Sequence, residues 1–373
     1  MLHLRLMALT LRLQRYALQF DFEARTSRGI MRDRTVWFLW AHDTTDPARQ
    51  GVGECAPLPG LSPELTPAFE GQLAAHVERL NAQKLPMPAA EDIEGFIERH
   101  AGSAEAVGSS VLFALEMALR DWQHGGQRLV FPGPFASGAP IPINGLIWMG
   151  GLDFMLQQIE IKIRQGFRCI KLKVGGLDFE KECDVLQYVR RKYFRENIVI
   201  RLDANGAFKP DEALYKLKEL SRFDIHSIEQ PLKTGAAELP DLCAQSPIPV
   251  ALDEELIGVH QRAKKEELLK RIRPQFVILK PSLHGGFSGT AEWIALAQQH
   301  GAGWWVTSAL ESSLGLNAIA QFTSQYPLAI PQGLGTGMIY SNNIESPLEV
   351  ERGVLRVGTS PWDLAELTER PEE

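Results

Sequence analysis

Five charged residues recur at the ends of short apolar segments in the second half of the sequence. In chain order they are Lys173, Asp203, Glu229, Asp253 and Lys280, at intervals from 24 residues (Glu229 to Asp253) to 30 (Lys173 to Asp203). A single charged residue at a strand end is more often a surface group than a catalyst. Five in succession, in the order Lys, Asp, Glu, Asp, Lys, indicate one common site.

The three carboxylates predict a metal site. Asp203, Glu229 and Asp253 would repel one another in one place unless a cation neutralised them. Ligands that are all oxygen favour a hard divalent ion, so we expect Mg²⁺, with Mn²⁺ as the alternative. Three carboxylates leave about half of an octahedron open to water and substrate. A metal held in this way can act as a Lewis acid.

The lysines flank the carboxylates. Lys173 precedes them and Lys280 follows them, a placement that suits an acid and a base on opposite sides of a bound carbon. Lys171 adds a second ammonium group on the strand face of Lys173, because alternate residues of a strand point the same way. Two like charges on one strand face repel each other, so a functional reason for keeping both lysines is expected.

The segments that carry these residues predict the elements that position them. Eight short apolar strands alternate with amphipathic helical patterns: IPINGLI, CIKLKVGG, IVIRLDAN, IHSIEQP, IPVALDEE, FVILKPS, GWWVTSA and PLAIPQGLGTG. Each interval suits one βα unit. Eight units favour an α/β fold of the (β/α)8 TIM-barrel type over an open sheet, which usually stops nearer five or six strands. The active site of such a barrel lies at the carboxyl ends of its strands.

The first part of the chain predicts an α+β capping domain over residues 1–135. RLQRYALQF and RTVWFLWA alternate as antiparallel strands do, AFEGQLAAHVERLNAQ and SSVLFALEMALRDWQ have helical periodicity, and GVGECAPLPGLSPE is typical of a loop. We expect the barrel at 136–347. The segment 348–373 is expected to return and complete the capping domain.

The composition limits the classes of partner that the protein is expected to bind. The formal net charge of −7, without a dense Lys/Arg run, argues against nucleic acid or an anionic membrane and leaves a small-molecule carboxylate as the expected partner. Four scattered cysteines favour a reducing cytoplasm. No apolar run approaches the length of about 18 residues that a membrane span needs, and no signal peptide is evident. The oligomeric state is not indicated.

The strand-end motifs KLK, RLDAN, IEQP, ALDEE, LKPSLHGG and TSALESSLGL resemble the muconate-lactonizing subgroup of the enolase superfamily. The resemblance covers about residues 140–347 and is greatest to members that convert 2-succinyl-6-hydroxy-2,4-cyclohexadiene-1-carboxylate to o-succinylbenzoate in menaquinone biosynthesis. It implies Asp203, Glu229 and Asp253 as Mg²⁺ ligands. It implies Lys173 as the general base and Lys280 as the opposed cation in a syn-dehydration through an enediolate.

The resemblance also implies a ring of supporting residues. Contacts to the substrate, including its succinyl carboxylate, are expected from Arg201, Thr307, Ser308, Gly333 and Gly335. Support for the metal ligands is expected from Asn205 and Glu254. Lys171 is expected to act on its neighbour, because a second cation favours the neutral form that a lysine base requires.

Two other functions remain open. A racemase of N-succinylamino acids or a dipeptide epimerase of the same superfamily carries the same residues and uses both lysines as bases. The sequence does not separate these reactions from dehydration. A barrel kept only as a binding module is disfavoured, because an idle site need not retain three carboxylates that repel one another.

Overall fold

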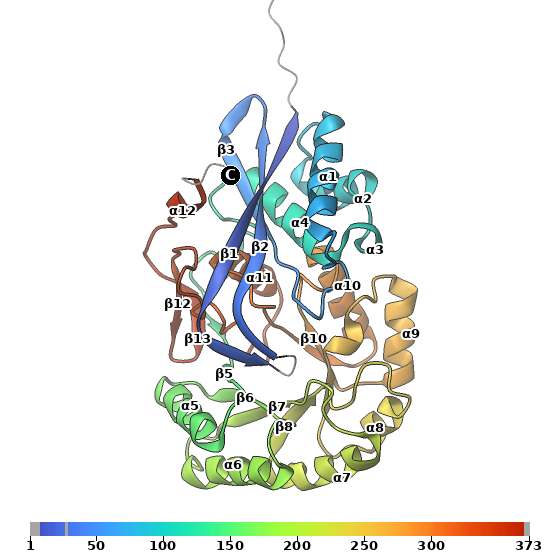
Figure 1. Ribbon diagram of the computed structural model, residues 1–373, viewed down its shortest axis with the longest axis vertical. Helices are drawn as coiled ribbons and strands as arrows, with labels where there is room; N and C mark the ends of the chain where they lie inside the picture. The colour runs from blue at the N-terminus through green and yellow to red at the C-terminus, as the bar shows by residue number, and fades with distance from the viewer. Residues whose placement is uncertain (1–7, 27–28, 369–373) are drawn as a thin grey trace, which may run out of the picture.

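The structure, a computed structural model, describes residues 8–26 and 29–368 of the 373-residue chain. Two bodies of secondary structure share this range. In Figure 1 an antiparallel sheet with helices beside it occupies the upper part of the view, and a parallel barrel with its own helices occupies the lower part. Among the described residues, no helix is long and apolar enough to cross a membrane.

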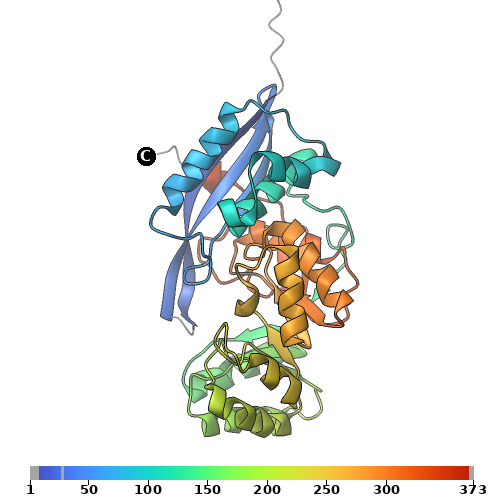
Figure 2. The same cartoon turned by 90° about the vertical axis from the view of Figure 1, so that its right-hand side faces the viewer.

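The antiparallel sheet consists of β1 (Leu9–Thr26), β2 (Gly29–Asp43) and β3 (Asp46–Cys55). Alternation along β2 buries both of its faces. Phe38 and Trp40 join the core that continues into the barrel, whereas Leu39 and Ala41 pack with the helices of the same domain. Those helices, which flank the sheet in Figure 2, are α1 (Phe69–Ala82), α2 (Ile93–His100), α3 (Ala104–Val107) and α4 (Ser109–Gln123).

The segment GVGEC, expected within a loop, is the second half of β3. Its glycines allow a close approach to α4. A Cβ atom would lie 2.0 Å from the carbonyl oxygen of Ala118 at Gly51, and 1.9 Å from that of Ala114 at Gly53. Glycine is therefore needed for strand–helix packing, which sequence alone does not distinguish from a turn.

The barrel strands follow one another around the sheet in sequence order. They are β5 (Gly145–Ile147), β6 (Cys169–Lys173), β7 (Val199–Asp203), β8 (Ile225–Glu229), β9 (Val250–Leu252), β10 (Phe276–Leu279) and β11 (Gly303–Val306). The helices after them are α5 (Leu152–Arg164), α6 (Phe179–Lys192), α7 (Pro210–Leu220), α8 (Leu239–Gln245), α9 (Arg262–Ile272), α10 (Gly286–Gln299) and α11 (Ser313–Thr323).

The eighth position closes the ring without a regular strand. Gln332 forms a parallel bridge with Ile143 on one side, and Gly333 forms one with Thr307 on the other. A hairpin of β12 (Leu348–Glu351) and β13 (Val354–Val357) follows and pairs with β4 (Ile141–Pro142), and α12 (Ala365–Thr368) ends the described chain. The expected (β/α)8-type barrel with an α+β cap is confirmed, and the hairpin agrees with the antiparallel strands that the sequence SPLEVERGVLRV predicts after the eighth strand. The division into 1–135, 136–347 and 348–373 is kept as a proposal.

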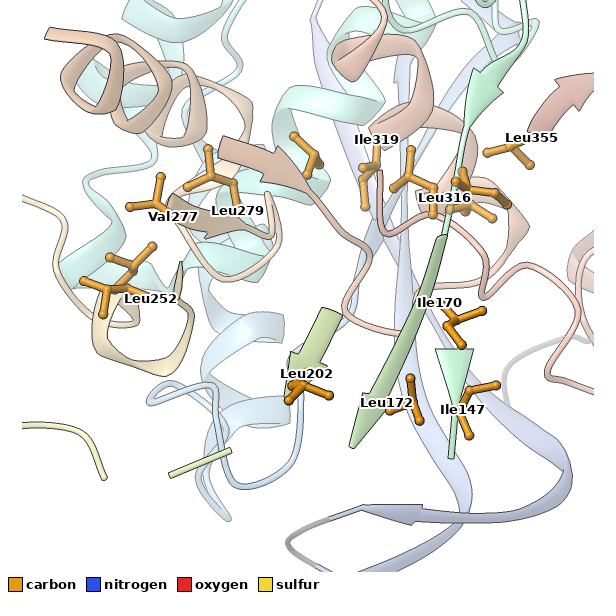
Figure 3. Packing of buried hydrophobic residues seen from close by; sticks show 14 of the residues in the cluster. Ile147, Ile170, Leu172, Leu202, Leu252, Val277, Leu279, Leu316, Ile319 and Leu355 are labelled. Atoms are coloured by element: carbon orange, nitrogen blue, oxygen red, sulfur yellow. The ribbon is translucent and has the colours of Figure 1, made fainter. Parts of the chain in front are cut away.

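Apolar residues alternate with the charged ones along the barrel strands. Leu172 lies between Lys171 and Lys173, and Leu202 precedes Asp203. Both leucines are at most 1% exposed and belong to the large core that includes residues of the surrounding helices. Figure 3 shows such residues on successive strands, among them Ile147, Ile170, Leu252 and Leu279. Period-2 geometry therefore directs the charged side chains to the opposite, inner face.

Two buried glutamates of the capping domain hold the amino-terminal ends of barrel helices. Glu116 of α4 accepts hydrogen bonds from the backbone N–H groups of Phe287 and Ser288 at the start of α10. Glu54 of β3 accepts from the N–H groups of Ser312 (2.8 Å) and Gly315 (2.9 Å) at the start of α11. Unsatisfied N–H groups at a helix start favour such acceptors, so these contacts join the two domains.

Candidate active site

The predicted lysines and carboxylates lie together at the carboxyl ends of neighbouring barrel strands. Lys173, Asp203 and Glu229 are the last residues of β6, β7 and β8, and Asp253 and Lys280 directly follow β9 and β10. Strands β6, β7 and β8 pair in a register that sets Lys173 beside Asp203 and Asp203 beside Glu229. Because parallel strands end at the same rim, sequence spacing is converted into spatial proximity.

Lys171 and Lys173 share Asp203 as a partner. The Nζ atom of Lys171 lies 3.0 Å from Asp203 Oδ2, and 2.8 and 2.7 Å from the two carboxylate oxygens of Glu229. The Nζ atom of Lys173 donates to Asp203 Oδ2 at 2.9 Å and to Asn205 Oδ1 at 2.6 Å. The two like charges of the KLK strand are therefore separated by the carboxylates between them.

Lys280 stands on the other side of the cluster. Its Nζ atom donates to both carboxylate oxygens of Asp253, at 2.6 Å for Oδ1. Its backbone N–H donates to Nδ1 of His284 at 2.9 Å, and that imidazole is 1% exposed. Burial lowers the pKa of His284 to about 3, so the ring is neutral and accepts through Nδ1.

Burial and charge act against each other on these groups. Burial alone would lower the pKa of Lys171, but attraction to Asp203 and Glu229 outweighs it and the pKa is raised. Burial would raise the pKa of Asp203, but Lys171 and Lys173 outweigh it and the pKa is lowered. The pKa of Glu229 is raised well above its usual value, first by burial and then by repulsion from Asp203. Burial more than charge therefore opposes ionisation of Glu229, and attraction to Lys171 and Lys280 acts in the other direction.

The donor set fits a hard divalent cation. Asp203, Glu229 and Asp253 are at most 2% exposed and offer only oxygen, as Mg²⁺ prefers. Within residues 8–26 and 29–368, no group of three His, Cys, Asp or Glu side chains is gathered closely enough to hold a metal ion by itself. The ammonium group of Lys171 contacts a carboxylate oxygen of Glu229, and that of Lys280 contacts a carboxylate oxygen of Asp253. A metal at these three carboxylates would therefore take over contacts that the lysines make.

Asn205 and Glu254 lie where support for the ligands was expected. The backbone N–H of Asn205 donates to Asp203 Oδ1 at 3.1 Å, and its Nδ2 donates to Glu254 Oε1 at 2.9 Å. Asn205 has a φ of +43°, a conformation that Asn tolerates better than most residues. It therefore connects the loop after β7 to the loop after β9.

Arg201 lies inside the barrel, away from the rim. It is 1% exposed, its guanidinium lies 4.2 Å from the ring centroid of Trp305, and Nη1 donates to the carbonyl oxygen of Pro331 at 2.8 Å. Since it stands two residues before Asp203 on β7, it occupies the layer below the carboxylates. These contacts give the guanidinium a packing role, and its expected contact with the substrate stays a prediction.

The donors expected to hold a carboxylate at β11 are engaged within the protein. Thr307 Oγ1 donates to the carbonyl oxygen of Gly333 at 2.8 Å, and Ser308 Oγ shares a hydrogen bond with Thr336. The backbone N–H groups of Thr307, Ser308 and Gly333 also donate to carbonyl oxygens. Gly335 lines a cavity to which none of the five charged site residues contributes. This network closes the barrel between β11 and the eighth position, which strand spacing alone could not reveal.

Sequence reasoning gave Gln230 no role, although the motif IEQP contains it. Its Oε1 accepts from the N–H groups of Asp253 and Glu255, both at 3.2 Å, and its Nε2 donates to the carbonyl oxygen of Leu232 at 3.0 Å. Gln230 has a φ of +38° and is 1% exposed. Gln230 therefore holds together the segments that follow β8 and β9. In the sequence, only its position next to Glu229 indicates such a role.

Comparison with known proteins agrees with this geometry. The family model Enolase C-terminal domain-like matches residues 155–361. The o-succinylbenzoate synthase of Desulfotalea psychrophila is 43% identical over 363 residues, covering 92% of this chain and 98% of that protein. The crystal structure of MenC from Desulfotalea psychrophila LSv54 is similar with a TM-score of 0.83 at 40% identity, covering 94% of this chain and 100% of that one.

A more distant structure shares the fold alone. The dipeptide epimerase from Enterococcus faecalis V583, complexed with Mg and the dipeptide L-Leu-L-Tyr, is similar with a TM-score of 0.80 at 17% identity. The match covers 95% of this chain and 98% of that one. The same architecture thus accommodates a different substrate.

Proposed function

The chain belongs to the enolase superfamily, and we propose that it is a lyase that dehydrates 2-succinyl-6-hydroxy-2,4-cyclohexadiene-1-carboxylate to o-succinylbenzoate in menaquinone biosynthesis. The observation that carries the proposal is the match at 43% identity over 98% of an o-succinylbenzoate synthase. The intact set of two lysines and three carboxylates supports it. Because the four cysteines are free, the proposal places the reaction in a reducing cytoplasm.

Enolase superfamily enzymes use Mg²⁺. In this proposal Asp203, Glu229 and Asp253 hold the ion. When bound, Mg²⁺ supplies positive charge to the substrate carboxylate and so makes the adjacent C1–H bond more acidic. Asn205 orients Asp203 from outside and is itself held by Glu254.

Lys173 moves the proton. Its neutral amine takes the proton from C1, and the C1–H electron pair passes into the substrate carboxylate. As the C6–O bond breaks, that pair returns to form the C1–C6 double bond, and Lys173 returns its proton to the departing hydroxide as water. One lysine serves both steps, so the proton and the hydroxyl leave from the same face. Lys280 places its ammonium beside the carboxylate while negative charge develops there.

The reaction is tested by incubating the purified protein with the cyclohexadiene substrate and Mg²⁺ while the aromatic product is followed by absorbance. We expect conversion that stops when the metal is chelated. A parallel incubation with N-succinylamino acids in D2O distinguishes dehydratase activity from racemase activity, because a racemase exchanges the α-proton for deuterium. Exchange at the α-carbon of both enantiomers, without dehydration of the cyclohexadiene, would contradict the proposed function.

A further inference from the structure

Lys233 is an exposed cation near the site that the mechanism above does not use. It lines a cavity of about 640 Å³ that Lys173, Met149 and Met155 also line. Together with Asn205, it also lines a second cavity of about 480 Å³. Neither salt bridges nor side-chain hydrogen bonds of Lys233 are found within the described ranges, 8–26 and 29–368. The base and this cation thus share one space of the size that small ligands occupy.

The backbone at Lys233 is held firmly although its side chain is exposed. Ala207 and Leu232 form an antiparallel bridge, and the N–H of Gly206 donates to the carbonyl oxygen of Gln230 at 2.7 Å. Gly206 has a φ of +74°, and a Cβ atom there would lie 3.0 Å from the Cα atom of Lys233. The loop after β7 therefore fixes where the lysine side chain begins, at the lining of the cavity.

The other charged groups of the two cavities are already engaged. Glu182 accepts from the N–H groups of Gly175 (2.6 Å), Gly176 (3.1 Å) and Leu177 (3.1 Å). Glu254 accepts from Asn205. Lys173 donates to Asp203 and Asn205. Lys233 is the cation of this group that can meet a new anion at the least cost in existing contacts.

The substrate of the proposed reaction needs a second anion contact. One carboxylate stands at the reacting carbon, and another ends the succinyl chain. The donors around Thr307 and Ser308 are committed to closing the barrel. We propose that Lys233 binds the terminal carboxylate of the succinyl chain and thereby selects substrates with an anionic end. This inference rests on the proposed function.

Charge makes this selection directional. A succinyl group ends in a carboxylate, whereas a dipeptide carries an ammonium group at the end remote from its C-terminal carboxylate. An ammonium group beside Lys233 meets like charge, and a carboxylate meets opposite charge. The same residue therefore favours succinylated substrates and disfavours dipeptides.

The test compares two ligands that differ only in the terminal group. Binding of o-succinylbenzoate and of 2-butanoylbenzoate is measured by calorimetry in the presence of Mg²⁺, for wild type and for Lys233→Met. We expect the affinity of Lys233→Met for o-succinylbenzoate to fall about tenfold, the size of one charge-assisted hydrogen bond of about 1.4 kcal/mol. Affinity for 2-butanoylbenzoate should change less than about twofold. In turnover the variant should raise KM and leave kcat unchanged.

Controls separate this role from a structural one. Lys264→Met removes an exposed lysine of α9 that lines neither cavity and should bind both ligands as wild type does. Lys233→Arg keeps the charge and should restore affinity for o-succinylbenzoate. Equal losses for both ligands, or no loss for either, would overturn the inference while dehydration by wild type still stood. Wild type that neither dehydrates the substrate nor binds o-succinylbenzoate would overturn the proposed function itself.

Discussion

The protein buries carboxylates in two regions and satisfies them differently. At the rim of the barrel, Asp203, Glu229 and Asp253 are met by lysine ammonium groups on flexible stems. Between the domains, Glu54 and Glu116 are met mainly by backbone N–H groups at helix starts. Ammonium groups can move aside for a metal or accept a new partner, whereas backbone donors are fixed by the helix. Equally buried carboxylates therefore suit metal and substrate binding at the barrel rim, and hold the capping domain against the barrel at the interface.

Among variants of the two regions, Lys280→Ala is expected to have the largest effect, a loss of catalytic rate. It removes the cation that faces Asp253 and the developing charge of the substrate, so kcat should fall at least about a thousandfold, or about 4 kcal/mol in the barrier. Steady-state dehydration assays measure the loss, and thermal unfolding checks that the variant is folded. Activity within tenfold of wild type would show that the ammonium is only a structural partner.

Glu116→Ala should act on stability. It leaves the N–H groups of Phe287 and Ser288 without their buried acceptor, so the free energy of unfolding should fall by about 3 kcal/mol. Urea unfolding with a domain-sensitive fluorescence signal measures the change. Glu116→Gln retains an acceptor oxygen and is the matched control. If both variants lose equally little, the interface does not depend on this contact.

The interface glutamates also predict a pH dependence. Burial raises the pKa of Glu116 to about 7, against the opposing effect of its Ser288 and Phe287 donors. An unfolded glutamate ionises near its ordinary value, so the unfolded state binds fewer protons between about pH 4.5 and 7, and stability falls as pH rises through that window. For a pKa shift of this size, the free energy of unfolding should fall by about 3 kcal/mol across the window.

Glu116→Gln isolates this contribution, because glutamine does not titrate. Thermal unfolding at pH 5 and pH 8 should show the variant gaining stability relative to wild type at the higher pH. A constant difference between the two proteins at both values would mean that Glu116 is ionised in the folded state throughout.

The smallest effect is expected from Lys171→Met. Without the ammonium, Asp203 and Glu229 repel each other in a buried place. Because Lys173 still contacts Asp203, the loss should stay below the roughly 3 to 5 kcal/mol of a fully unpaired buried charge, at about 1 to 2 kcal/mol for the metal-free variant. Mg²⁺ should stabilise the variant more than wild type, because it replaces a lost positive charge. Melting temperatures at several Mg²⁺ concentrations give the comparison. An Mg²⁺ response equal to that of wild type would argue against a metal at these carboxylates.

Sequence predicted which charged residues lie together better than it predicted their surroundings. The spacing of Lys173, Asp203 and Glu229 follows directly from βα units, and parallel strands turn such spacing into proximity. Gly51 and Gly53 were taken for loop residues because close packing and turns both require glycine. The pairing of Glu54 and Glu116 with helices α11 and α10 depends on domain docking, which local pattern does not encode.

The substrate contacts were the hardest part to predict. Thr307 and Ser308 had the right chemistry for a carboxylate, but the structure commits their donors to closing the barrel. Arg201 shares a strand face with Asp203, yet the layer that it occupies is filled by Trp305. A residue's type and face can be inferred from sequence, whereas the partners that compete for its donors emerge only when the barrel is closed.

The central claim, that Lys173 moves the proton between C1 and the departing hydroxyl, is tested most directly by Lys173→Ala. The variant is assayed with the cyclohexadiene substrate and saturating Mg²⁺ beside wild type, with thermal unfolding as a check on its fold. We expect a folded protein whose dehydration rate falls by at least about a thousandfold. A folded Lys173→Ala protein that still forms o-succinylbenzoate at close to the wild-type rate would contradict the account.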